Sequence, residues 1–273
     1  MMNHGVWRGR FQAVVGGKSR LVDSYHRAPL KIAKPFYGDS GEIILYMMDT
    51  SPGIFNGDTQ EIDCTLEQGV HLLLTNQSSC KLQPSVKQAE SRQTVRFRIG
   101  ANAVLEYFPE PVVPFCGSDF QSRTQIEMEQ GGQLFFSEIL TPGRAGKGEV
   151  FEYKSYRSET SIYYNQQPIV FDCIHFQPKL DPACTKGLHG YTHMGTLYAV
   201  SPKIADLDIQ RVRDLLASGN DLSLYAGVSA LPVGGLTIRV LGYTACTVQQ
   251  LLTECWGMLR EQAAGLGKFR FRK

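Results

Sequence analysis

IDCTLEQGVHLLL, residues 62–74, carries the fold prediction because two later stretches repeat its plan. Each stretch has a strand-like run, a glycine turn and a second strand-like run; the other copies are VRFRIGANAVLEYF at 95–108 and IEMEQGGQLFFSEIL at 126–140. The turn glycines Gly69, Gly100 and Gly131 are 31 residues apart. A fixed period of roughly 20–50 residues indicates supersecondary units that stack on one another.

The loops that follow the second run of each copy are expected to lie along one edge of the stack, because stacked repeats place equivalent loops on the same side. Such an edge can form a surface for a partner protein. The loop residues predicted to dock a partner are Asn76, Gln77, Lys81, Pro109, Pro111, Arg144 and Lys147.

The whole chain, residues 1–273, is predicted to be a single, mainly β domain. Stacked antiparallel strand pairs would build a β-helix-like or layered scaffold over about residues 5–200. About two α-helices are expected in the part from about 203 to 266, one over Asp206–Ala217 and one from Thr247, which forms a capping box with Gln250. No helical pattern appears before them, which disfavours a parallel α/β fold.

Composition narrows the function classes. The 273 residues are 42% hydrophobic and carry a formal net charge of +2, so no polybasic character points to nucleic acid. No run of about 18 apolar residues suggests a membrane span, and the first residues lack the apolar core of a signal peptide. The seven cysteines include no C-x-x-C pair. We therefore expect a cytoplasmic protein that binds neither nucleic acid nor membrane.

Catalytic motifs receive little support from the sequence. The stretch GRAGKG at 143–148 resembles a phosphate loop, but only Arg144 and Ala145 separate Gly143 from the Gly-Lys pair and no Ser or Thr follows the lysine. No Gly-x-Ser-x-Gly elbow is present either. We therefore predict that the protein is not an enzyme, although an enzyme with a cavity between its strands remains an alternative.

Cys184, His189 and His193 form the spacing C-x4-H-x3-H, and thiolate and imidazole are ligands that zinc and nickel accept. This glycine-rich interval lacks the glutamate that a zincin motif places after its first histidine. The three residues are candidate metal ligands, and loop histidines with ordinary hydrogen bonds are the simpler alternative.

Two glutamates fall on apolar faces of predicted strands. Glu138 alternates with Leu134 and Phe136, and Glu106 alternates with Val104 and Phe108. A buried ionised carboxylate is costly unless it is paired or binds a metal, so a polar interior that carries a cation would explain both. A strand that exposes this side is the alternative, since the opposite face of the strand that contains Glu138 is apolar too.

Five segments, read in order, resemble the urease accessory protein family called UreD, or UreH in some bacteria. They are APLKIAKP at 28–35, GIFNGD at 53–58, TNQSSCK at 75–81, LEYFPEPVVPF at 105–115 and GRAGKGE at 143–149. The resemblance covers about residues 5–200. Two positions depart from the family pattern, because 54–56 is bulkier than a glycine-rich form and Leu82 stands where an aromatic residue is usual.

The resemblance implies a mainly β, non-enzymatic scaffold that assists nickel insertion into urease. It implies binding to the accessory protein UreF, which recruits the GTPase UreG, and docking of this assembly on apo-urease. It also implies a nickel path through the protein, without a tightly bound cofactor. The candidate path carboxylates are Asp58, Glu106, Glu138 and Glu149. A nickel carrier that uses Cys184, His189 and His193 is the alternative function.

Overall fold

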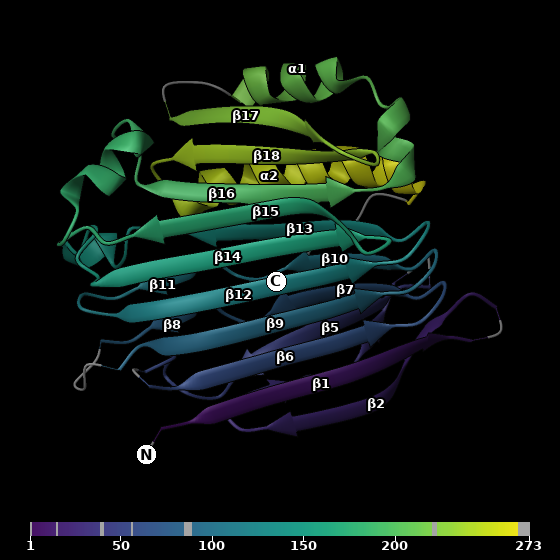
Figure 1. Ribbon diagram of the computed structural model, residues 1–273, viewed down its shortest axis with the longest axis horizontal. Helices are drawn as coiled ribbons and strands as arrows, with labels where there is room; N and C mark the ends of the chain where they lie inside the picture. Colours follow the sequence, from purple (N-terminus) through teal and green to yellow (C-terminus); the bar gives the residue numbers. More distant parts are fainter. Residues whose placement is uncertain are drawn as a thin grey trace.

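The computed structural model describes residues 2–14, 16–38, 41–55, 57–84, 89–219 and 223–266, which form two stacked β-sheets with helices beside one of them (Figure 1). Sheet 1 has the strand order β15 (Gln167–Phe176), β14 (Ser155–Tyr164), β12 (Asp119–Met128), β9 (Ser91–Ile99), β6 (Thr59–Leu66), β1 (His4–Ala13) and β2 (Ser19–Arg27). The mainly β prediction is confirmed.

Sheet 2 is the larger of the two sheets in these ranges. Its main path is β17 (Leu224–Leu231), β18 (Gly235–Gly242), β16 (His193–Val200), β13 (Gln133–Leu140), β10 (Val104–Phe108), β7 (His71–Asn76), β5 (Ile43–Asp49) and β3 (Leu30–Ile32). Three short strands lie off this path, namely β4 (Phe36–Tyr37), β8 (Cys80–Leu82) and β11 (Val112–Pro114).

Each repeated unit crosses from one sheet to the other at its glycine turn. The first runs, β6, β9 and β12, are parallel neighbours in sheet 1, and the second runs, β7, β10 and β13, are parallel neighbours in sheet 2. The stacked, β-helix-like scaffold is therefore confirmed. However, the two runs of a unit pair in parallel with the runs above and below them, and not antiparallel with each other, because the turn spans the core between the sheets.

The register of the strands shows which turn residues are equivalent. Leu66 pairs with Ile99 and Ile99 with Met128, offsets of 33 and 29 residues, so the constant 31-residue spacing of the glycines is only an average. The equivalent turn positions are Gly69, Asn102 and Gly131, which all have positive φ, at +70°, +56° and +74°. Glycine and asparagine adopt this left-handed conformation most readily.

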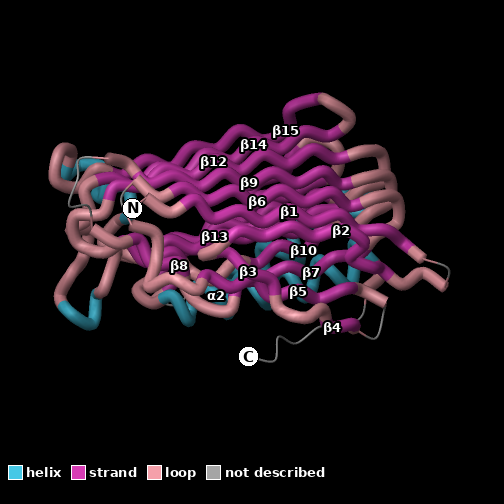
Figure 2. The backbone as a smooth tube through the Cα atoms, turned by 90° about the horizontal axis from the view of Figure 1, so that it is seen from below, coloured by secondary structure: helices cyan, strands magenta, loops and turns pink. Residues whose placement is uncertain are grey.

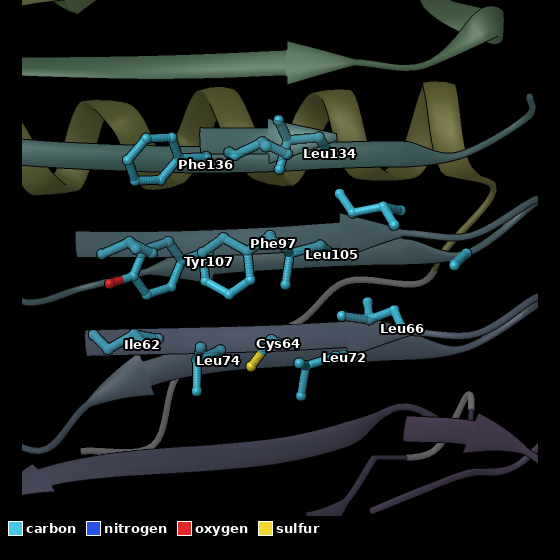
Figure 3. Close-up of a cluster of buried hydrophobic side chains, with 14 of the residues drawn as sticks. Ile62, Cys64, Leu66, Leu72, Leu74, Phe97, Leu105, Tyr107, Leu134 and Phe136 are labelled. Atoms are coloured by element: carbon cyan, nitrogen blue, oxygen red, sulfur yellow. The ribbon is translucent and has the colours of Figure 1, made fainter. Parts of the chain in front are cut away.

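The main core lies between the sheets (Figure 3). Aromatic rings from successive units stack along the axis: the ring centroids of Phe97 and Tyr107 are 4.9 Å apart, those of Tyr107 and Phe136 are 5.3 Å apart, and those of Phe136 and Tyr198 are 5.7 Å apart. Offset aromatic pairs at such distances stabilise a core beyond the area that they bury.

Sheet 2 is apolar on both faces because helices cover its outer side. Helix α2 (Ala245–Leu259) packs Val248, Leu252 and other apolar residues against Leu73 and Phe135 of the sheet. A Cβ atom at Gly195 would meet Val248 Cγ1 at 2.5 Å, so this glycine permits the close approach. Thr244, rather than Thr247, caps the helix, since its side chain accepts the Thr247 amide.

Helix α1 (Ile209–Gly219) follows the predicted position, and a π-helical turn, η4 (Arg260–Ala264), continues α2. The described ranges also contain three 3₁₀ helices, η1 (Ala145–Lys147), η2 (Pro182–Leu188) and η3 (Pro202–Asp206). Among the described residues, no helix is both long enough and apolar enough to cross a membrane.

The return loops stack on one edge of the solenoid, as predicted. β8 pairs in parallel with β11, and the amide of Thr141 donates to the Val112 carbonyl. Likewise the amide of Ile54 donates to the Lys81 carbonyl. The loops therefore continue the stacking of the strands instead of projecting separately into solvent.

Candidate functional site: a polar belt between the sheets

Glu106 and Glu138 face opposite sides of sheet 2. In the parallel register of β10 and β13, Glu106 pairs with Phe135, whereas Glu138 lies on the same side of β13 as Leu134 and Phe136. Leu134 and Phe136 belong to the core between the sheets, and Phe135 belongs to the cluster beneath the helices. The two glutamates thus lie in different environments.

Glu106 is fully buried beneath α2 and its carboxylate has several partners. The Trp256 indole donates to Oε2 at 2.6 Å, Arg260 Nε lies 3.1 Å from the same oxygen, and His71 Nε2 lies 2.6 Å from Oε1. Arg260 also reaches Glu42 at 3.4 Å. We call Glu42, His71, Glu106, Trp256 and Arg260 the anchor cluster, because it ties the C-terminal helix to sheet 2.

Glu138 faces the space between the sheets. Ser158 on β14 donates to its Oε2 at 3.1 Å, and Thr196 is its cross-strand neighbour on β16. The pKa of Glu138 is raised to about 7, chiefly by burial and also by the nearby Asp172, while the Ser158 hydrogen bond and the charge of Arg239 oppose the rise. Within the described residues no cation forms an ion pair with this carboxylate. Because its pKa is about 7, the carboxyl group is protonated in part at pH 7.

Other inward-facing polar residues lie level with Glu138. In sheet 1 the register aligns Gln60, Gln93, Ser122 and Ser158 across four adjacent strands. Gln93 donates to Gln60 at 3.0 Å, and Gln60 donates to Asp49 of sheet 2 at 2.6 Å. We call this set the polar belt, and its members are Asp49, Gln60, Gln93, Ser122, Glu138, Ser158, Asp172, Thr196 and Arg239.

The polar belt separates two apolar clusters and reaches the surface at both ends. The main core lies on one side of it, and a second cluster that includes Phe120, Leu140 and Tyr156 lies on the other. At one end Asp49 helps to line a small pocket, together with Leu30 of β3 and with residues of the loop edge such as Lys81. At the far end Arg239 pairs with Asp172, and both side chains are partly exposed.

Some oxygens in or beside the belt are buried and lack a hydrogen-bond partner among the described residues. They include Thr160 Oγ1, Thr196 Oγ1 and Asn76 Oδ1. Buried hydroxyl and amide oxygens without a protein partner usually bind ordered water or an ion. The interior at this level therefore has the chemistry to hold a small polar species.

Two of the predicted path carboxylates lie outside the belt. Asp58 accepts the amides of Asn3 and Phe55 at 2.6 and 3.1 Å, which closes the turn before β6. Glu149 pairs with Arg144 and accepts the Cys116 amide at 3.2 Å. The hydrogen bond from Arg144 lowers the pKa of Glu149.

The candidate metal ligands Cys184, His189 and His193 do not come together as a cluster. Cys184 lies in η2, His189 is exposed just after it, and His193 is buried at the start of β16, where its Nδ1 bonds Thr192 at 2.9 Å. Burial lowers the pKa of His193. Among the described residues, no group of three or more histidine, cysteine, aspartate and glutamate side chains is placed to hold a metal ion.

The predicted docking residues lie along the loop edge. Asn76 ends β7, Lys81 is exposed on β8 and Lys147 is exposed in η1. The Pro111 carbonyl accepts the Cys80 amide, and the Arg144 guanidinium lies 4.2 Å from the centre of the Phe115 ring. Gln77 and Pro109 begin the turns after β7 and β10. The binding of a partner to this edge remains a prediction.

Sequence reasoning missed Asp49, Gln60, Asp172 and Arg239. Asp49, Gln60 and Asp172 lie at inward positions of their strands, and Arg239 is partly exposed at the end of the belt. The alternation is visible in β6, where Gln60 alternates inward with Ile62 and Cys64. Period-two patterning could have placed Gln60 on the buried face. It could not have shown that strands more than 100 residues apart bring Asp49 and Asp172 to one level.

The fold and the belt define a β-solenoid that has helices over one of its sheets and a row of polar residues between the two sheets. The family model described as "UreD urease accessory protein" matches residues 4–272. Proteins named urease accessory protein UreD include one from Lysinibacillus sphaericus, 35% identical over 79% of this chain and 80% of its own length, and one from Acetivibrio thermocellus, 34% identical over 88% and 91%. The chain belongs to the UreD family of urease accessory proteins.

Proposed function

We propose that the protein is a non-enzymatic scaffold in urease maturation, which joins a UreF-like protein and, through it, a UreG-like GTPase to apo-urease in the cytoplasm. Nickel is the cargo of this assembly, and it passes through the scaffold along the polar belt. The observation that carries the proposal is Glu138, a carboxylate inside the belt with hydroxyl neighbours and no paired cation among the described residues.

The belt suits transit of a divalent cation. Carboxylate and amide oxygens bind divalent cations. Asp49 places one carboxylate at one end of the belt, Glu138 places one in the middle, and Asp172 places one at the other end, where Arg239 pairs with it. A site with a single carboxylate ligand binds a cation more weakly than a site with three or four protein ligands. Nickel would therefore be passed on and not stored, and transient nickel is the only cofactor that we propose.

We propose different roles for the predicted path carboxylates. Glu138 binds nickel transiently in the middle of the path. Both carboxylate oxygens of Glu106 already have partners in Trp256, Arg260 and His71, so we assign Glu106 to the anchoring of α2. The backbone contacts of Asp58 and the Arg144 pair of Glu149 give these two residues structural roles as well.

The test is maturation of urease in cells that carry the accessory proteins and either wild type or Glu138→Gln, which keeps the shape of the side chain and removes its charge. We expect the variant to co-purify with the UreF-like partner and apo-urease as wild type does, while the nickel content of the urease falls by about tenfold or more. Glu159→Gln, on the outer face of β14, is the matched control and should leave nickel content unchanged.

Normal nickel loading by Glu138→Gln, in a complex of normal composition, would remove the belt from the path while leaving the scaffold role intact. Failure of wild type to co-purify with either partner would instead argue against the scaffold role itself.

A further inference from the structure

Strands β2, β3 and β4 lie at the N-terminal end of the solenoid (Figure 2). We call residues 18–37 the N-terminal cap. Among the described residues, β1 is the one strand that pairs with β2, and no further strand lies along the other edge of β2. Five exposed cations lie in the cap against one acid, Asp23, and they are Lys18, Arg20, Arg27, Lys31 and Lys34.

The cations of the cap differ from those on the outer face of sheet 1. There Arg8 pairs with Glu61 and Arg98 with Asp63, and Arg123 and Arg157 share Glu159. By contrast, none of the five cap cations forms an ion pair within the described ranges. Five cations and one acid give the cap a charge of +4, against +2 for the whole chain, so the rest of the protein is net negative.

Apolar side chains lie among these charges. Tyr25 is 55% exposed, Phe36 and Tyr37 are each 57% exposed, and Val22 is 38% exposed. The Phe36 ring packs edge-on against Tyr46, which holds it in place. Exposed end units of a solenoid normally carry a polar face, whereas aromatic residues and arginine are enriched in protein interfaces. The mixture therefore has the composition of a docking surface.

The cap also borders one mouth of the polar belt. Leu30 of β3 pairs with Asp49 of β5, and both residues line the pocket at that end. Lys31 follows Leu30 directly and is exposed. A protein seated on the cap would thus cover the place where the belt opens.

We propose that the N-terminal cap docks an acidic surface of apo-urease, with the aromatic residues at the centre of the contact and the cations around them. The choice of urease rests on the proposed function, and the charge of the bound surface follows from the unpaired cations. Docking there brings the receiving protein to the Asp49 end of the belt. The binding should be fast and salt-dependent, because unpaired charges around a contact mainly steer association.

The experiment measures association and dissociation of purified apo-urease on the full-length chain, in complex with its UreF-like partner, at about 0.02 M and about 0.5 M salt. The cap variant combines Arg20→Glu, Arg27→Glu, Lys31→Glu and Lys34→Glu. The matched control reverses the charge of four exposed side chains at the opposite end of the solenoid. Its substitutions are Lys186→Glu, Lys203→Glu, Arg211→Glu and Arg213→Glu.

We expect the cap variant to associate about 10–100-fold more slowly than wild type at low salt, with a much smaller difference at high salt, and the control to match wild type. A second variant with Tyr25→Ser, Phe36→Ser and Tyr37→Ser should instead dissociate about tenfold faster. Because all these side chains are exposed, retention of the UreF-like partner shows that each variant is folded.

Equal association by wild type and the cap variant at low salt would overturn the inference, while the proposed scaffold role would stand. Equal loss in the opposite-end control would overturn it too, because the effect would then reflect overall charge. Binding of the cap to anionic vesicles or RNA, with urease binding unchanged by the variants, would likewise show that the cap does not bind apo-urease. No binding of apo-urease by wild type would overturn both the inference and the proposed function.

Discussion

The anchor cluster and the polar belt are two ways of burying carboxylates on opposite faces of the same sheet. Glu106 is surrounded by an arginine, an indole N–H and a histidine, whereas Glu138 has one hydroxyl donor and no paired cation among the described residues. The first arrangement holds a charge in place and stabilises the helix layer. The second leaves the carboxylate free to change its protonation or its partner, which a transfer path requires.

Removal of the charge in the anchor cluster should have the largest effect. Glu106→Gln leaves Arg260 with one carboxylate fewer and weakens two short hydrogen bonds, so we expect the free energy of unfolding to fall by about 3 kcal/mol. Urea unfolding followed by tryptophan fluorescence measures this loss, since Trp256 lies in the cluster.

Glu61→Gln is the control for that measurement, because the Glu61–Arg8 pair is exposed on sheet 1 and should contribute about 0–1 kcal/mol. Similar losses for the two variants would mean that the anchor cluster does not hold α2 on the sheet.

The pH dependence of Glu138 should be the next largest effect. The folded protein keeps this proton up to about pH 7, whereas the unfolded chain releases it near pH 4.5, the usual pKa of a glutamate. The folded state therefore binds more protons between these values, and stability falls as pH rises from 4.5 to about 7. Glu138→Gln cannot ionise, so above pH 7 we expect its free energy of unfolding to exceed that of wild type by up to about 3 kcal/mol.

Urea unfolding at about pH 5 and about pH 8 measures this difference. Glu159→Gln supplies a contrast of opposite sign, because the hydrogen bond from Arg157 lowers the pKa of Glu159 and its contribution is present above the unfolded pKa. An identical pH slope for wild type and Glu138→Gln would show that this carboxylate is not desolvated.

Thr196→Val should have the smallest effect and reports whether the belt is hydrated. The Thr196 hydroxyl is buried beside Glu138 with no partner among the described residues. If it bonds water inside the belt, as the proposed path requires, its removal should cost about 1 kcal/mol. A gain in stability, measured by thermal unfolding, would indicate a dry interior and argue against a path at this level.

Much of the fold could be predicted because local patterns set it. The repeated strand, turn and strand units, the shared loop edge and the C-terminal helices are all visible in the sequence. The spacing of the units was less accurate, because Asn102 takes the left-handed position that Gly100 was expected to hold. A search for glycine alone misses an asparagine that adopts the same conformation.

The candidate site was only partly predictable. Alternation correctly placed Glu106 and Glu138 on apolar faces, but it could not say which face each one shares with the core. Sheet 2 is covered on both sides, by sheet 1 and by α2, so both faces of its strands read as apolar. Only the register of β10 with β13 separates the two glutamates.

The sequence by itself determined the stacked units, the β class and the family resemblance, because turn conformation and alternation depend on residues close together in the chain. The tertiary structure decided which polar residues meet. The anchor cluster joins Glu42 to Arg260, and the polar belt joins Asp49 to Arg239, through the stacking of strands and the docking of a helix far apart in sequence. Such contacts depend on register and layer order, which no local pattern specifies.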